Sequence, residues 1–199
     1  MDRLFVIARH GQSVLNVKRL VNGDPARDVP LTEQGEKESR RLGEELAHLP
    51  LDVCVHTRFP RTRATAEAVV AGRRVPFAEE PLLDDIDVGD FDFRPVDDYR
   101  EWKLGHARSD PFPGGESLDG AARRYGAAFR RLLGRVEPNV LVVCHEIPLR
   151  YALNAAGGSD SLDGPIHELG NAVPYLFDGE ALARAAARIE DLVGTVQRE

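Results

Sequence analysis

The chain has 199 residues, of which 42% are hydrophobic, and a formal net charge of −7. Its length suits one well-buried core, so we expect residues 1–199 to form a single domain. The acidic balance argues against a general affinity for nucleic acid or for anionic membranes, since both require a basic excess. A small anionic substrate is still compatible with this balance, because the local charge of a site matters more than the total.

The first residues contain no basic segment followed by an apolar stretch and a cleavage site, and no apolar run approaches membrane-spanning length. We therefore expect a cytoplasmic protein with no membrane partner. Cys54 and Cys144 each lie inside an apolar run, where small buried side chains belong. We expect both to be structural rather than a disulfide or a metal pair.

Short apolar runs alternate along the chain with longer amphipathic patterns, which is typical of an α/β domain with a largely parallel sheet. Thr32 predicts the start of a helix whose Leu42 and Leu46 face the core. In chain order, the pattern predicts strands at 3–8, 51–56 and 139–144, and helices at 32–47, 60–71, 117–136 and 147–156.

Two segments have less regular patterns. Residues 78–116 are rich in Asp, Phe and Pro and include Tyr99 and Trp102. They form either a cap over a site or a surface excursion whose aromatic side chains pack inward. Near the C-terminus, 174–177 is typical of a strand that turns back as a hairpin, whereas 181–193 has helix formers at helical spacing. The sequence leaves these alternatives open.

The tripeptide Arg9-His10-Gly11 stands where the first apolar segment ends, and it brings reactive side chains to a strand end. A neutral ring nitrogen of His10 is a nucleophile, and the guanidinium of Arg9 grips an anion with a planar fork of donors. Gly11 lets the backbone approach a ligand closely. Together the three residues suggest phosphoryl chemistry.

Two further candidates follow other predicted strands. Arg61 lies at the start of a helix just beyond the second strand, where an arginine and a helix N-terminus both favour phosphate. His145 follows the most apolar segment of the chain. Because ligands in open α/β sheets collect at the carboxyl ends of strands, His10 and His145 are expected in one crevice. Considered alone, Arg61 is more simply interpreted as a solvated basic residue. His145 alone is more simply a strand-end residue whose ring is hydrogen-bonded within the fold.

The acidic stretch 84–90 is the fourth candidate. Clustered carboxylates supply an acid with a raised pKa or a metal site. The spacing of an EF-hand is absent, and a solvated loop is an equally good interpretation on this stretch alone.

Taken together and in order, these motifs resemble the histidine phosphatase superfamily, the phosphoglycerate mutase-like proteins. The resemblance runs from about residue 4 to about residue 173. It implies a three-layer α/β/α fold, a phosphohistidine intermediate, and no metal or other cofactor. The motifs that carry it are Arg9-His10-Gly11, Asn16, Gly23, Pro30 to Gly35, Arg61 with Thr65 and Ala66, Asp85 to Phe91, Pro113 to Ser117, and His145.

The resemblance implies a role for each matching residue. His10 becomes the nucleophile, and Arg9, Arg61 and His145 form the phosphate pocket. Two guanidiniums and a protonated His145 would then match the charge of a phosphate monoester. His10 must stay neutral, which requires its other ring nitrogen to donate a hydrogen bond to a backbone carbonyl. Asn16 is a further substrate contact, and Asp85 is the general acid and base.

Two residues depart from the family pattern. The family usually has Glu where Asp85 stands, and the aspartate side chain is one methylene shorter. Asp84 and Asp87 are therefore alternative candidates for the acid. The residue after the second histidine is usually Gly, but here it is Glu146. A carboxylate there would repel phosphate, so we expect Glu146 to point away and to contribute only its backbone N–H to substrate binding.

The favoured function is a metal-independent phosphatase acting on a small phosphorylated metabolite. A phosphoglycerate mutase is the first alternative, although the chain is short for that branch and 78–116 shows no match to its substrate-holding insertion. The second alternative is a weakly active phospho-ligand-binding module. Family members often pair, which leaves a homodimer open, but the sequence shows no exposed apolar stripe.

Overall fold

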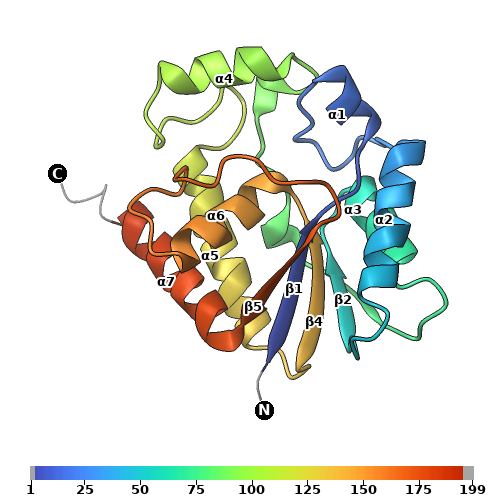
Figure 1. The fold of residues 1–199 in the computed structure, drawn as a ribbon. Coiled ribbons are helices and arrows are strands. Elements are labelled where there is room, and N and C mark those ends of the chain that lie inside the picture. The colour runs from blue at the N-terminus through green and yellow to red at the C-terminus, as the bar shows by residue number, and fades with distance from the viewer. Residues whose placement is uncertain (1–2, 195–199) are drawn as a thin grey trace.

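The computed structural model describes residues 3–194, and its centre is a five-stranded sheet in the order β3-β2-β4-β1-β5 (Figure 1). Four strands are parallel, and β5 runs antiparallel beside β1. The strands are β1 (Leu4–Arg9), β2 (Val53–His56), β3 (Phe77–Glu79), β4 (Asn139–Cys144) and β5 (Pro174–Asp178).

The register of β1 and β4 brings two predicted site residues together. The strands pair from Leu4 with Asn139 to Arg9 with Cys144, so the next residue of each chain segment is a histidine. The His10 N–H donates to the Cys144 carbonyl at 3.0 Å, which continues the ladder by one step. Both strands are almost fully buried apolar runs, as central parallel strands are.

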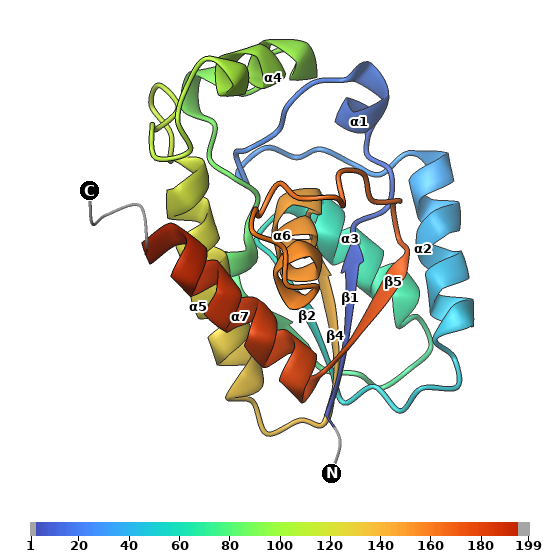
Figure 2. The same ribbon diagram turned by 60° about the vertical axis from the view of Figure 1, so that its left-hand side comes forward.

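Helices cover both faces of the sheet and confirm the three-layer α/β/α fold. α2 (Glu33–Glu45) and α3 (Pro60–Val69) lie on one face, and α5 (Leu118–Leu133), α6 (Glu146–Ala156) and α7 (Gly179–Gly194) lie on the other (Figures 1 and 2). Thr32 caps α2 by accepting a hydrogen bond from Gly35 N, and Leu42 and Leu46 are buried as predicted. Cys54 and Cys144 are free and buried in the sheet.

The C-terminal alternatives resolve into a strand and a helix. β5 pairs with β1 at the edge of the sheet rather than forming a hairpin with a sequence neighbour, and α7 follows directly. Its buried Leu182, Ala185 and Ile189 pack against α5 and α6. In residues 3–194 no helix is long and apolar enough to cross a bilayer.

Two helices that the sequence did not predict lie beyond the carboxyl ends of the strands. They are α1 (Val14–Lys18) and α4 (Val96–Leu104), and both views place them at this end of the sheet (Figures 1 and 2). Under α4, Tyr99 stacks on Phe112 with centroids 5.3 Å apart, and Trp102 lies 4.2 Å from the same ring. Tyr99, Trp102 and Phe112 therefore pack inward, whereas Phe93 is exposed, and α4 also lines a pocket at this end of the sheet. Two short 3₁₀ turns, Pro81–Leu83 and Gly89–Phe91, precede α4.

Candidate active site

A pocket of about 310 Å³ opens at the carboxyl ends of β1, β2 and β4. One wall comes from the strand ends and from α3 and α6, and the other comes from α1, α4 and the segment after α1. Its lining includes Arg9, His10, Asn16, Asn22, Arg61, Asp85, Tyr99, Arg100, Lys103, Glu146 and Arg150. His145 lies directly behind Arg61 and is fully buried.

His10 is held in one protonation state by its two ring contacts. Nδ1 lies 2.7 Å from the Gly11 carbonyl, which only accepts, so Nδ1 carries the proton. Nε2 accepts a hydrogen bond from Arg61 Nε at 3.0 Å and therefore has a free lone pair when Arg61 turns to another acceptor. Burial and the neighbouring Arg61 and Arg9 guanidiniums hold the pKa of His10 well below its usual range. The neutral His10 expected from the sequence is present.

Arg61 joins the other groups of the site. It lies in the first turn of α3 after Pro60, and its guanidinium lies 4.2 Å over the Phe59 ring. Besides His10, it donates to His145 Nδ1 at 3.0 Å and to Asp85 Oδ2 at 3.1 Å. Burial lowers the pKa of Arg61 to about 10, so it remains a cation at neutral pH.

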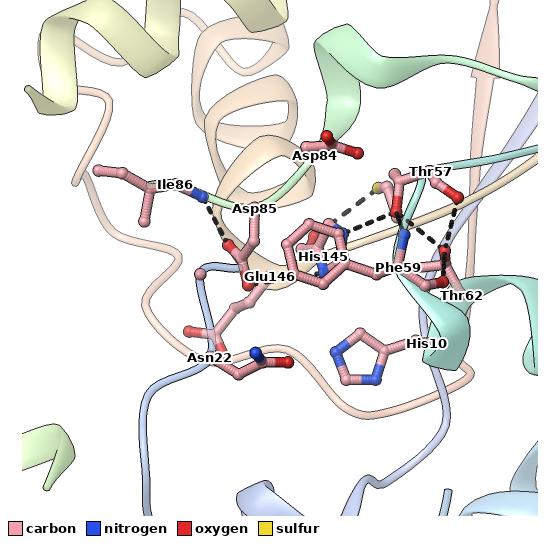
Figure 3. Close-up of polar contacts among 12 residues, drawn as sticks. His10, Asn22, Thr57, Phe59, Thr62, Asp84, Asp85, Ile86, His145 and Glu146 are labelled. Atoms are coloured by element: carbon pink, nitrogen blue, oxygen red, sulfur yellow. Dashed lines mark hydrogen bonds and ion pairs between the residues drawn. The ribbon is translucent and has the colours of Figure 1, made fainter. Parts of the chain in front are cut away.

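Without a bound anion His145 is neutral, so its protonation opposite a phosphate stays a prediction. Because its Nδ1 accepts from Arg61, its Nε2 carries the proton and donates to Thr57 Oγ1 at 2.9 Å. Thr57 in turn hydrogen-bonds the Thr62 hydroxyl at 2.9 Å (Figure 3). Burial, followed by the charges of Arg61 and the other cations, lowers the pKa of His145 well below its usual value.

Of the three acidic candidates, Asp85 faces the histidines. Its Oδ2 lies 3.5 Å from His145 Nδ1, whereas Asp84 is turned away and accepts from Arg58 Nε at 2.5 Å (Figure 3). Asp87 is exposed and accepts from Gly89 N. Burial raises the pKa of Asp85 against the opposing charge of Arg61, as suits an acid that must hold a proton.

Hydrogen bonds from a side chain of α5 hold the backbone that carries Asp85. Arg124 donates to the carbonyls of Leu82 and Asp84, each at 2.9 Å, and to that of Asp85 at 3.3 Å. Arg124 also pairs with Glu116 at 2.5 Å, and Glu116 accepts from the Asp87 N–H. The acid therefore lies on a segment whose main chain is held by one partly buried guanidinium.

The prediction that the Glu146 side chain points away from the pocket is wrong. Its Oε2 lies 2.7 Å from Arg9 Nη1, and its Oε1 lies 3.6 Å from Arg150 Nη1. The physical reason is the first turn of α6, which brings Glu146 beside a guanidinium whose other hydrogen-bond partner within residues 3–194 is the Leu169 carbonyl. Arg9 thus shares its charge with a carboxylate that belongs to the wall of the pocket.

Comparisons with known proteins identify the family of this chain. The family model for the histidine phosphatase superfamily (branch 1) matches residues 5–191. The chain belongs to the histidine phosphatase superfamily. A 2,3-bisphosphoglycerate-dependent phosphoglycerate mutase from Methylobacterium sp. (strain 4-46) is 33% identical over 194 residues, which cover 89% of this chain and 91% of the relative.

Solved structures share the fold at lower identity. A putative alpha-ribazole-5'-P phosphatase from Escherichia coli superposes with a TM-score of 0.78 at 22% identity, covering 88% of this chain and 90% of that one. A mycobacterial glucosyl-3-phosphoglycerate phosphatase gives 0.74 at 20% identity, covering 89% and 91%. The structural likeness supports the histidine phosphatase fold.

Two residues that the sequence assigned to substrate contacts also have structural roles in this member of the histidine phosphatase superfamily. Gly11 donates its N–H to Thr65 Oγ1 at 2.9 Å, and a Cβ at this position would meet the Gly35 carbonyl oxygen at 2.4 Å. Gly11 is therefore required for packing against α2 and does not line the pocket, and its close approach to a ligand stays a prediction. Asn16 lines the pocket, while its Oδ1 caps α1 by accepting from Ser13 N.

The sequence interpretation missed other residues of the site. Asn22 accepts from Arg61 Nη1 through its side chain and from Arg61 Nη2 through its carbonyl at 3.3 Å. Asn171 donates to the His10 carbonyl at 2.8 Å. Thr57 could have been found, because it follows β2 as His10 and His145 follow their strands. Asn22 and Asn171 lie in loops that carry no such signal.

Proposed function

We propose that this histidine phosphatase superfamily member is a phosphomonoesterase that hydrolyses a small phosphorylated metabolite through a phosphohistidine on His10. The observation that supports it best is the arrangement of His10, with Nδ1–H on a carbonyl and the Nε2 lone pair facing the Arg61 guanidinium. A phosphate bound by Arg9 and Arg61 takes over the Arg61 donors and releases that lone pair. No metal is required, because side chains supply the positive charge.

In the first step the Nε2 lone pair attacks phosphorus and the bond from phosphorus to the ester oxygen breaks. Asp85 gives its proton to the departing alkoxide, and the Gly11 carbonyl stabilises the charge that forms on the ring through Nδ1–H. In the second step the Asp85 carboxylate takes a proton from water, whose oxygen attacks phosphorus. The phosphorus–nitrogen bond breaks, and neutral His10 and inorganic phosphate are restored.

The charges of the pocket change when phosphate enters. A phosphate monoester carries about −1.5 to −2 charge at neutral pH. Arg61 and Arg9 supply two positive charges, and the anion favours protonation of the neutral His145 that lies behind Arg61. The positive charge that matches the phosphate is therefore completed only when the phosphate binds.

A phosphoglycerate mutase is the second candidate, and the names of the curated relatives favour it. A mutase uses the same first step but returns the phosphoryl group to a bound hydroxyl in place of water. The two candidates differ in the fate of the phosphohistidine, which is therefore the quantity to measure.

The test combines phosphate release with isomerisation. We expect the wild type to release phosphate from 4-nitrophenyl phosphate and from small alkyl phosphates with a chelator present. His10→Ala should lower this rate by about 10⁴-fold or more, while the exposed His48→Ala serves as the matched control. Conversion of 3-phosphoglycerate to 2-phosphoglycerate that outpaces phosphate release would replace the phosphatase with the mutase. A folded wild type without either activity would favour a binding module.

A further inference from the structure

One face of α4 forms a wall of the pocket that the proposed reaction does not use. Val96, Tyr99, Arg100 and Lys103 line the pocket, and their spacing of three, four and seven residues places them on one side of the helix. They face the space where the leaving group of a phosphate ester would lie once phosphorus is next to His10. This wall is therefore the one that selects among phosphate esters.

The pocket is strongly cationic although the whole chain is acidic. Its lining has two carboxylates, Asp85 and Glu146, and six cationic side chains. The net charge of the whole chain, in contrast, is −7. Five of the six have a carboxylate within 4.0 Å: Arg9 and Arg150 share Glu146, Arg19 and Arg100 share Asp97, and Arg61 has Asp85.

Lys103 is the exception. No carboxylate among residues 3–194 lies within 4.0 Å of its ammonium group, which instead lies 4.8 Å over the Tyr99 ring. Partial burial and the charges of Arg150, Arg108 and Arg100 lower the pKa of Lys103 to about 8. A cation held among cations in a half-buried wall is stabilised when an anion arrives.

Buried side-chain atoms without a hydrogen-bond partner within residues 3–194 lie on both walls of this pocket. Among the described residues, six buried side-chain atoms have no hydrogen-bond partner, and three of them belong to residues of this pocket: Arg9 Nε, Tyr99 Oη and Arg150 Nε. Buried polar groups are nearly always paired in native proteins, so a cluster of unpaired ones calls for an explanation. These atoms mark the pocket as polar on both sides, with Arg9 and Arg150 on one wall and Tyr99 on the other.

We infer that the leaving group of the substrate carries a second negative charge, a carboxylate or another phosphate, which binds to Lys103 with Arg150 and Arg100 beside it. This inference rests on the proposed function and names the substrate class of the same pocket. The reacting phosphate occupies Arg9 and Arg61 at the strand ends, and Glu146 is already paired with Arg9 and Arg150. Lys103 is left as the cation available to the rest of the substrate.

The test compares esters that share two carbons and differ in end-group charge: phosphoglycolate, 2-hydroxyethyl phosphate and phosphoethanolamine. We expect kcat/KM for phosphoglycolate to exceed that for the neutral ester by about tenfold, the size of one charge-assisted hydrogen bond. The cationic ester should be the poorest substrate. Ethylene glycol bisphosphate distinguishes a second phosphate from a carboxylate as the favoured group.

Lys103→Gln should bring the ratio of phosphoglycolate to the neutral ester close to one, and Lys103→Arg should retain most of the preference. Lys37→Gln, which removes the same charge from the exposed face of α2, is the control that keeps the wild-type ratio. Equal rates for the three esters, or a preference for phosphoethanolamine, would overturn the inference while leaving the phosphatase intact.

A failure of the proposed function gives a different result. In that case the wild type hydrolyses none of the esters, including 4-nitrophenyl phosphate, and calorimetric titration of the same three compounds tests the pocket instead. Tighter binding of phosphoglycolate that depends on Lys103 would support the second anion site without hydrolysis. Equal affinity for phosphoglycolate and 2-hydroxyethyl phosphate would exclude it.

Discussion

The two walls of the pocket are built differently. At the strand ends, His10, Arg61 and His145 are at most 3% exposed, and each hydrogen-bonds to backbone or to another side chain of the site. On the opposite wall, Arg100 is exposed and Lys103 has no ionic partner within residues 3–194. The first wall holds a connected hydrogen-bond network around the two histidines, whereas the second presents a lysine whose charge is not paired with a carboxylate of the described part of the chain.

This difference suggests a division of labour. Reacting groups need a fixed geometry, and a parallel sheet fixes it because each strand end is held by its neighbours. Selectivity needs only a complementary charge and shape, which a helix outside the sheet can supply without disturbing the reaction. Variants of the first wall should therefore change the rate for every substrate, and variants of the second should change the choice among substrates.

Asp85→Asn should have the largest effect in this comparison, because Asp85 belongs to the reacting wall. We expect turnover of an alkyl phosphate to fall by about 10²- to 10⁴-fold, the usual contribution of a general acid. A nitrophenolate leaves without a proton, so rapid-quench measurements should still show formation of the phosphoenzyme from 4-nitrophenyl phosphate. Asp84→Asn is the matched control, since Asp84 pairs with Arg58 outside the site.

The pH profile gives a second readout of Asp85. Its pKa is raised by burial, so the acid stays protonated to a higher pH than an ordinary aspartic acid, and the rate with alkyl phosphates should fall as the pH rises through that pKa. His10 has a lowered pKa and stays a nucleophile well below pH 6.5. An alkaline limb that persists in Asp85→Asn would assign the acid to another group.

Arg124→Gln should have an intermediate effect, because Arg124 acts through the backbone that positions Asp85. We expect kcat for alkyl phosphates to fall about tenfold with little change in KM, in line with the loss of hydrogen bonds from a charged donor. The rate of phosphoenzyme formation from 4-nitrophenyl phosphate should fall less, since that step does not need the acid.

Arg130→Gln is the control for this variant, because Arg130 lies on the same helix and pairs with Glu190 at the surface. Arg124→Lys should recover part of the loss. An equal loss with both kinds of ester, together with a lower melting temperature, would show that Arg124 serves stability alone.

The same division explains how much of the molecule is predictable from the sequence. Periodicity predicts β1, β2, β4 and most helices but not the short edge strand β3, and the rule that ligands collect at strand ends brings His10 and His145 together. The place of Arg61 at a helix start adds it to the same site. These inferences work because hydrophobic burial fixes the strands, and the strands fix the position of the residue directly after each of them.

The rest depends on contacts that no local pattern encodes. Repulsion from phosphate predicts that Glu146 avoids the pocket, but its position in the first turn of α6 leaves Arg9 as its nearest strong partner. Charge matching predicts a protonated His145 opposite phosphate, but the sequence does not show that complete burial beside Arg61 keeps the ring neutral before the anion binds. Lys103 reaches the pocket only because α4 packs on Phe112 through its aromatic side chains.

Glu146→Gln changes a residue at the boundary between the two walls. Of these variants it should have the smallest effect on substrate binding and turnover. The ion pair with Arg9 is partly exposed, with side chains 16% and 31% accessible, so its loss is worth at most about 1 kcal/mol. Freed of this partner, Arg9 should bind inorganic phosphate about three- to fivefold more tightly, measured as a competitive inhibition constant. Glu180→Gln, at an exposed pair on α7, is the control. Weaker phosphate binding would mean that Glu146 holds Arg9 in its productive orientation, and the residue would then belong to the reacting wall rather than to the boundary between the two.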